Sequence, residues 1–207
     1  MKDIWFTADL HISHNKEFLY GPRGFANEIE MNEAIVERWN NLVKPEDTVY
    51  NLGDMAMSDI DSAIPYLKRL NGMQVWLFGN HDTKSKIERI LRECHHNIYL
   101  LQYDTHATVI KDGKMSIHLS HYPTLTANFD DKGFSKHVLA LHGHTHQRTN
   151  FYHPDNPFLY HVGMDSHDCK PVHIDEVRAD VRNRWNELGM NTPILKAPNN
   201  YSVFYET

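Results

Sequence analysis

Short apolar runs alternate with amphipathic segments through the first half of the chain. The run Ile4–Thr7 is apolar and β-prone, and residues 48–52 and 73–78 share this character. Each run has the length and composition of a buried strand. Residues 28–43 carry Ile, Trp and Leu at spacings of four and three, which predicts an amphipathic helix between the first two strands. This half of the chain therefore predicts alternating strands and helices.

Two shorter helices extend that alternation. Apolar residues at 60, 64 and 67 predict a helix in which Pro65 lies in the first turn or introduces a kink. Apolar residues at 87, 90 and 91 predict another short helix after the third strand.

The second half of the chain is richer in strands. Asp112 and Gly113 are typical of a hairpin turn between two of them. Residues 175–185 place Val177 and Val181 on one face and predict a helix. The expected strands cover residues 98–103, 106–110, 115–120, 138–141 and 158–164. The combination predicts an α/β fold of the mixed α+β kind, with two sheets packed face to face and helices outside.

The length of 207 residues is appropriate for one domain with a substantial core. The sequence has no internal repeat and no low-complexity linker, so we expect a single domain over residues 1–207. Its motifs lie within a core of residues 1–175, and a C-terminal helix and tail occupy residues 176–207. The Pro- and Asn-rich stretch 191–207 supports no assignment.

The composition and net charge limit the classes of molecule that the protein is expected to bind. Hydrophobic residues make up 41% and the net charge is −6, which argues against a broad surface for duplex nucleic acid without excluding nucleic acid altogether. No run approaches the length of about 20 apolar residues that a membrane span requires, and the first residues lack an apolar signal core. Cys94 and Cys169 are expected as free buried thiols. We therefore expect a cytoplasmic protein without a membrane partner; its oligomeric state stays open.

The chain contains an unusually large number of histidines, 16, and several of them recur at regular spacings. Polar clusters recur immediately after apolar strands, the position where α/β sheets bind ligands. In extended backbone, residues two apart project to the same side, so D-x-H and H-x-H each present two side chains to one point. The clusters are Asp9-Leu10-His11, Gly53-Asp54, Gly79-Asn80-His81-Asp82, Ser120-His121 and Gly143-His144-Thr145-His146.

Two carboxylates, one amide oxygen and four or five imidazoles are too many ligands for one ion and enough for two. Mixed oxygen and nitrogen ligands without cysteine favour two divalent ions, with Mn²⁺ preferred and Fe, Zn²⁺, Ni or Co as alternatives. Two such ions ~3.5–4 Å apart clamp a phosphoryl group and lower the pKa of a bridging water toward ~7, and the resulting hydroxide attacks phosphorus in line. An imidazole that binds neither ion can then protonate the leaving oxygen.

The order D-x-H, G-D, G-N-H-D, H and G-H-x-H resembles the calcineurin-like metallophosphoesterase superfamily from Asp9 to His146. The stretches WFTADLHISH, TVYNLGD and SHYP resemble its small stand-alone bacterial and viral members. The resemblance implies a four-layer αββα sandwich. It also implies one metal held by Asp9, His11, Asp54 and His146, and a second held by Asp54, Asn80, His121 and His144. His81 would be the proton donor and phosphate contact, which makes His81, Asp54 and Asn80 the expected catalytic residues.

Other residues near these motifs have two interpretations each. Arg23, in a glycine-flanked loop, either binds a phosphate oxygen together with Asn80 and His81 or is a solvated loop arginine. Asp82 either orients a loop or an imidazole or is a plain surface carboxylate. His14 either caps its loop or reaches the phosphate. Histidines 161, 167 and 173, which surround GMDSHD, are more typical of surface or turn positions than of ligands.

The leading hypothesis is a dinuclear-metal phosphoesterase, a phosphodiesterase or phosphomonoesterase, that hydrolyses a small phosphate ester such as a nucleotide. A nuclease or a protein phosphatase would use the same metal site. A metal-bearing interaction scaffold without turnover is the alternative from another class, although scaffolds typically lose the proton-donating histidine or several ligands. The H-x-H of metallo-β-lactamase-like hydrolases is excluded because Gln147 and Arg148 stand where their Asp-His pair would follow.

Overall fold

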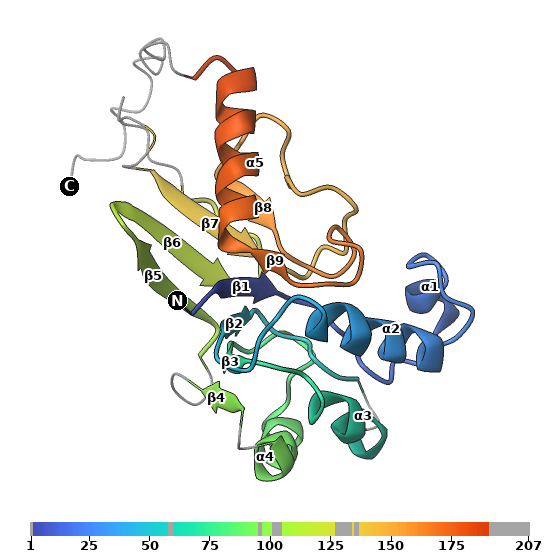
Figure 1. Cartoon of the computed structure of the whole chain (residues 1–207). Helices are drawn as coiled ribbons and strands as arrows, with labels where there is room; N and C mark the ends of the chain where they lie inside the picture. The colour runs from blue at the N-terminus through green and yellow to red at the C-terminus, as the bar shows by residue number, and fades with distance from the viewer. Residues whose placement is uncertain are drawn as a thin grey trace, which may run out of the picture.

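The computed structural model of the chain is a layered α/β sandwich (Figure 1). It describes residues 2–57, 60–94, 97–100, 105–126, 134 and 137–190. Two mixed sheets with helices were predicted, and this class of fold is confirmed. The tail at 191–207 and residues 101–103 of one expected strand lie outside the described residues.

The first sheet has the strand order β4-β3-β2-β1-β9. Its first four strands are parallel neighbours in register, with Phe6 opposite Tyr50 and Tyr50 opposite Val75, whereas β9 pairs antiparallel to β1. The carboxyl ends of β1, β2 and β3 therefore meet at one edge of the sheet. The strands are β1 (Ile4–Thr7), β2 (Thr48–Asn51), β3 (Met73–Trp76), β4 (Ile98–Leu100) and β9 (Val172–His173).

The second sheet has the order β5-β6-β7-β8. Strands β5 and β6 form the antiparallel hairpin expected around Asp112 and Gly113, and β6, β7 and β8 run parallel. The loops that follow β6 and β7 therefore also emerge side by side. The strands are β5 (Ala107–Asp112), β6 (Met115–Ser120), β7 (Val138–His142) and β8 (Leu159–His161).

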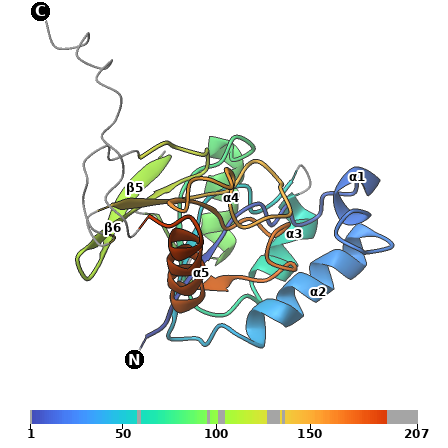
Figure 2. The ribbon, with the colours of Figure 1, turned by 90° about the horizontal axis from the view of Figure 1, so that it is seen from above.

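Helices α2, α3 and α4 pack against the first sheet, while α5 shares the apolar cluster of the second sheet. Helix α5 lies apart from the other three in Figure 1, and Figure 2 shows the same helices from above. The short α1 and the two-residue β9 carry no pattern that predicted them. Pro65 lies inside α3 and not in its first described turn. The helices are α1 (Glu17–Tyr20), α2 (Glu28–Asn40), α3 (Ile60–Leu67), α4 (Lys84–Cys94) and α5 (Ile174–Glu187).

Two apolar clusters hold the layers together. Phe6, Leu77, Leu119 and Leu141 come from both sheets and are almost fully buried in one cluster. The other cluster joins the helices to the first sheet, and the buried Trp39 of α2 also donates its indole N–H to the carbonyl of residue 71 at 2.9 Å. Both clusters anchor strands whose loops carry the predicted ligands. Among the described residues, no helix combines the length and the apolar character that a membrane crossing requires.

Candidate metal centre

The predicted ligands lie in loops that leave the carboxyl ends of strands in both sheets. Hydrogen bonds and short contacts link all of these side chains into one connected group. The loops come from parts of the chain more than a hundred residues apart, as the motif order predicted. The residues are Asp9 and His11 after β1, Asp54 after β2, Asn80 after β3, His121 after β6, and His144 and His146 after β7.

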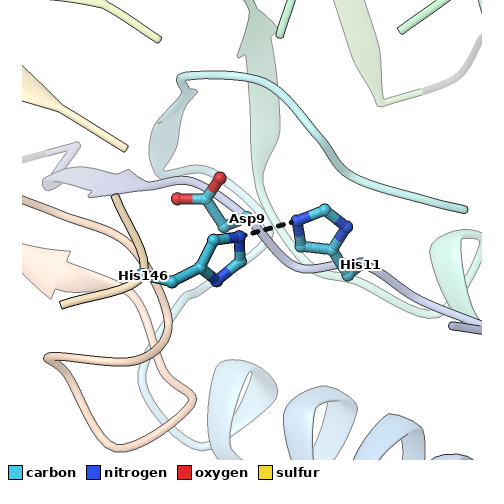
Figure 3. A group of neighbouring side chains, drawn as sticks. All are labelled: Asp9, His11 and His146. Atoms are coloured by element: carbon cyan, nitrogen blue, oxygen red, sulfur yellow. Dashed lines mark hydrogen bonds between the residues drawn. The ribbon is translucent and has the colours of Figure 1, made fainter. Parts of the chain in front are cut away.

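Asp9, His11 and His146 form one potential ligand set, in which one atom of each lies within 4.8 Å of the others (Figure 3). The Nε2 atoms of the two imidazoles are 3.2 Å apart. The Asp9 carboxylate is fully buried, and its Oδ1 has no hydrogen-bond partner among the described residues. Burial without a compensating cation raises the pKa of Asp9 to about 6, although the neighbouring histidines act in the opposite direction.

A second set joins Asp9 to Asp54 and His121. Asp54 Oδ2 lies 3.8 Å from His11 Nε2 and 3.4 Å from His121 Nε2, between the two groups of imidazoles. Asp54 Oδ1 accepts the backbone N–H of His81 at 2.8 Å. Burial would raise the pKa of Asp54, but these contacts outweigh it and lower the pKa to about 2.

The surroundings of His121 show that its Nε2 needs a positively charged partner or a proton. Its Nδ1 is 2.8 Å from the carbonyl of Leu52, which can only accept, so Nδ1 must be the donor. Its Nε2 faces two oxygens, Asn80 Oδ1 at 2.7 Å and Asp54 Oδ2 at 3.4 Å. Asn80 Oδ1 is also 2.9 Å from His144 Nδ1. Convergence of these lone pairs near the buried carboxylate of Asp9 fits a bound divalent cation.

The backbone of the ligands differs from the extended geometry on which the sequence argument relied. Five of the seven predicted ligands have left-handed φ angles, between 49° and 67°. These five are Asp9, His11, Asp54, His144 and His146. Non-glycine residues avoid this region, and such outliers cluster at functional sites, each costing about 1–3 kcal/mol. The paired side chains of D-x-H and H-x-H therefore meet through two strained turns and not through the alternation of a strand.

Glycines allow the loops to approach the carboxylates closely. A Cβ at Gly79 would lie 2.2 Å from Asp54 Oδ1, and a Cβ at Gly143 would lie 2.6 Å from Asp9 Oδ2. Asp82 holds together the two loops that carry Asp54 and Gly79, because its Oδ2 accepts the backbone N–H of Asp54 at 2.8 Å and of Gly79 at 2.9 Å. Of its two interpretations, the structure therefore supports loop orientation.

Arg23 does not contact the open side of the site. Its side chain is 1% exposed, and its N–H groups donate to both oxygens of Asp165 and to the carbonyls of Asp9 and Leu10, with a longer contact to Met31 Sδ. The interpretations of Arg23 as a phosphate contact and as a solvated loop residue both disagree with this burial. Burial opposes its charge, but Asp165 outweighs that effect and raises the pKa of Arg23.

Asp165 is the functional candidate that sequence reasoning missed. Its Oδ2 accepts a hydrogen bond from His146 Nδ1 at 2.8 Å, and its side chain is 10% exposed. Asp165 lies in GMDSHD, a polar cluster that follows strand β8, so the rule that found the other clusters also applied to this one. The nearby His161 and His167 are buried and not at the surface.

His14 and His142 lie beside the ligands without joining them. The ring of His14 is 5.5 Å from that of His11 and 5.4 Å from that of Phe18. His142 is fully buried and directs its Nδ1 to the carbonyl of Gly143 at 2.8 Å, and burial lowers its pKa to about 4. His142 therefore supports the turn before the ligands, in agreement with its absence from the ligand pattern.

Comparison with known proteins finds similar sequences, two of which are more than 30% identical to this chain. The gene 66 protein of Mycobacterium phage D29 is 31% identical over 196 residues, which cover 86% of this chain and 95% of the phage protein. The uncharacterized protein MJ1445 of Methanocaldococcus jannaschii is 33% identical over 183 residues, which cover 84% of this chain and 89% of that protein. No family model matches the chain.

Among solved structures, a protein of unknown function from Aquifex aeolicus, AQ665, has the same fold, with a TM-score of 0.64. It is 22% identical, and the match covers 86% of this chain and 99% of that protein. The phosphoesterase YfcE of E. coli is 15% identical with a TM-score of 0.41, over 78% of each chain.

Proposed function

We propose that this chain, which belongs to the same family as the phage D29 gene 66 protein and MJ1445, is a metal-dependent phosphoesterase that acts on a small phosphate ester. The observation that carries the proposal is the meeting of lone pairs at His121. Its Nε2 faces two oxygens, from Asn80 and Asp54, and a carboxylate oxygen of the buried Asp9 lies within 4.8 Å of the ligand atoms of Asp54 and His121. The order of the motifs adds the resemblance to calcineurin-like metallophosphoesterases.

The two ligand groups that the motif order implied would hold two cations, and Asp54 belongs to both groups. When bound, two divalent cations supply positive charge for the phosphoryl oxygens and activate water for attack on phosphorus. We assign the first cation to Asp9, His11, Asp54 and His146, and the second to Asp54, Asn80, His121 and His144. Mn²⁺ is the preferred metal for this donor set.

We assign the protonation of the leaving oxygen to His81. Its side chain is exposed at the site, and its ring lies 5.6 Å from that of His11. Its backbone is fixed on two sides, because its N–H donates to Asp54 and its carbonyl accepts from Lys86 Nζ at 2.6 Å. An imidazole held beside the reacting group can act as a general acid near neutral pH.

The rim of the site favours an ester with a planar leaving group, such as a nucleotide. Tyr122 is 48% exposed, and its ring lies 4.6 Å from that of His144. Phe18 is 73% exposed and packs edge-on against His14. Exposed aromatic rings next to polar groups are typical of surfaces that bind planar rings. Because Arg23 is buried elsewhere, we expect the metals and His81, with Asn80, to contact the phosphate itself.

The test is turnover by Mn²⁺-loaded protein on a phosphate monoester, a phosphodiester, 2′,3′-cyclic nucleotides, single-stranded DNA and a phosphopeptide. We expect hydrolysis of a small ester, and we expect the Asp54→Asn variant to lose both turnover and metal affinity. Asp61→Asn is the control, since this carboxylate is exposed on α3 and pairs with Arg89. Bound metal without turnover on any of these substrates would instead indicate an interaction scaffold. Preferential cleavage of DNA or phosphopeptide would indicate a nuclease or a protein phosphatase.

A further inference from the structure

A buried ion pair lies directly behind the potential metal ligand His146. Arg23 and Asp165, separated by 142 positions, join through two parallel hydrogen bonds of 3.0 and 2.8 Å. Their side chains are 1% and 10% exposed. Two parallel bonds between a guanidinium and a carboxylate fix both groups in one plane and are stronger than bonds between neutral groups. The pair therefore has a defined orientation.

Asp165 uses the same oxygen to hold the imidazole. Its Oδ2 accepts from Arg23 Nη2 at 2.8 Å and from His146 Nδ1 at 2.8 Å. A carboxylate accepts and does not donate, so the proton of this bond is on Nδ1 of His146. Nε2, the nitrogen that faces His11, is then left with a free lone pair in the neutral ring.

Arg23 connects this arrangement to the first ligand loop. Its Nη2 also donates to the carbonyl of Asp9 at 2.7 Å, and its Nη1 donates to the carbonyl of Leu10 at 3.1 Å. Asp9 has a left-handed φ of 58°, so Arg23 binds the carbonyl of a residue whose backbone is strained. One guanidinium therefore bridges the loop that carries Asp9 and the carboxylate that orients His146.

We propose that Asp165 and Arg23 are positioning residues, which hold His146 with its proton on Nδ1 and its Nε2 directed at the first cation. The proposal rests on the proposed function in so far as a metal binds there. Ligands of a metal commonly donate their second ring N–H to a carboxylate, and loss of such a partner weakens metal binding about 10- to 100-fold. A purely structural ion pair would stabilise the fold without affecting the affinity for metal.

The first test uses the unaltered chain loaded with diamagnetic Zn²⁺. Histidine-selective ¹⁵N NMR should show a proton on Nδ1 of His146 that exchanges slowly with water, because Asp165 covers it. The signal should be absent from the Asp165→Asn variant. An Nδ1 of His146 without a protected proton in the unaltered chain would overturn the proposal, whatever the variants do.

The second test measures the Mn²⁺ dissociation constants by competition with a chelator. Asp165→Asn should lower the Mn²⁺ affinity of one of the two sites about 10- to 100-fold and leave the affinity of the other site nearly unchanged. Asp168→Asn is the matched control, since this acidic residue in the same segment has a 77% exposed side chain and pairs with Arg38. The control should bind Mn²⁺ as the unaltered chain does.

The single variant leaves Arg23 buried without its partner and can fail to fold. The double variant Arg23→Met with Asp165→Asn removes both charges and restores foldability while His146 still lacks its carboxylate. We expect the same loss of affinity. A folded single or double variant with the affinity of the unaltered chain would refute the proposal.

The outcome separates this inference from the proposed function. If the chain hydrolyses no phosphate ester but shows the Nδ1 proton and the selective loss of affinity, the phosphoesterase is rejected and the positioning role stands. If it hydrolyses an ester while Asp165→Asn binds Mn²⁺ normally, the positioning role is rejected and the phosphoesterase stands. A chain that binds no metal rejects both.

Discussion

The close approach of Gly79 to Asp54 gives the most direct test of how the site is built. A Cβ at this position would lie 2.2 Å from Asp54 Oδ1 and 2.8 Å from both Cγ and the backbone N of Asp54. A contact below 3.0 Å forces one of the two groups to shift, so Gly79→Ala requires the new Cβ and the Asp54 carboxylate to move apart by at least 0.8 Å, the difference between 3.0 and 2.2 Å. Asp54 is buried and bonded to the backbone of His81, so it cannot swing away freely.

A displacement of about 1 Å at a reacting centre costs about 100-fold in rate, because the catalytic groups no longer meet in the productive geometry. We therefore expect Gly79→Ala to lower kcat/KM by about 100-fold and to weaken metal binding, with the protein still folded. The assay is steady-state hydrolysis of the best ester from the substrate panel, together with Mn²⁺ affinity and far-UV circular dichroism.

Gly113→Ala is the matched control. Gly113 also has a positive φ, 56°, but it lies at the tip of the β5–β6 hairpin, and a Cβ there has no atom within 4 Å. This substitution should cost about 1–2 kcal/mol of stability from the left-handed backbone alone and leave kcat/KM unchanged. Full activity and metal affinity in Gly79→Ala would refute the packing argument. An equal loss of activity in both variants would show that global destabilisation is the cause.

Three further predictions follow from individual contacts. His81→Ala should lower kcat about 10²- to 10⁴-fold while Mn²⁺ affinity is kept. Stopped-flow or steady-state assays test this beside the surface control His153→Ala, and an unchanged kcat would show that His81 is dispensable. Removal of metal with a chelator should lower Tm, and Mn²⁺ should restore it in a concentration-dependent way; a Tm that ignores Mn²⁺ would contradict a metal site in the native state. Asp47→Asn should destabilise the fold by about 2–4 kcal/mol at pH 7, because the buried carboxylate accepts hydrogen bonds from the backbone N–H of Asp3 and Lys44 and from the Trp5 indole. Burial would raise the pKa of Asp47, but these bonds outweigh it and lower the pKa, so the stabilisation is present above the unfolded pKa of about 3.9 and is lost as pH falls through the lower folded value. Urea unfolding at pH 7 and at pH 3 should show the difference between Asp47→Asn and the unaltered chain shrinking at the lower pH.

The sequence predicted which polar residues lie together, because each of them follows an apolar strand and both features are local. Asp54 follows β2 and His121 follows β6, and parallel strands necessarily bring such ends together. The helices were also predicted from local patterns. Helix α2 has an apolar stripe, and it ends at Asn40 instead of the expected 43, although the backbone N–H of Val43 still donates to the carbonyl of Trp39 at 2.8 Å.

The contacts that could not be predicted join residues that are far apart in the sequence. Nothing near Arg23 indicates that its partner is Asp165, 142 positions later, because the partner is set by how the GMDSHD segment crosses the end of β1. The fork geometry of arginine produced the phosphate-binding interpretation, and the usual exposure of a loop arginine produced the solvated one. Once the fold is known, the bidentate geometry and the burial exclude both interpretations directly.

The same dependence on distant pairs explains how the strained ligands persist. A left-handed φ at a non-glycine residue is unfavourable by about 1–3 kcal/mol, so each such residue needs compensation from its surroundings. Here the compensation comes from other ligand loops: His11 N–H donates to the carbonyl of Asp54 at 3.0 Å, and His144 N–H donates to Asp9 Oδ2 at 2.9 Å. Asp54 N–H in turn donates to Asp82. Because each strained turn is held by a neighbouring turn, the protein itself positions the proposed ligands. For the proposed function, such preorganisation would let binding energy act on the phosphoryl group instead of being spent on ordering the site.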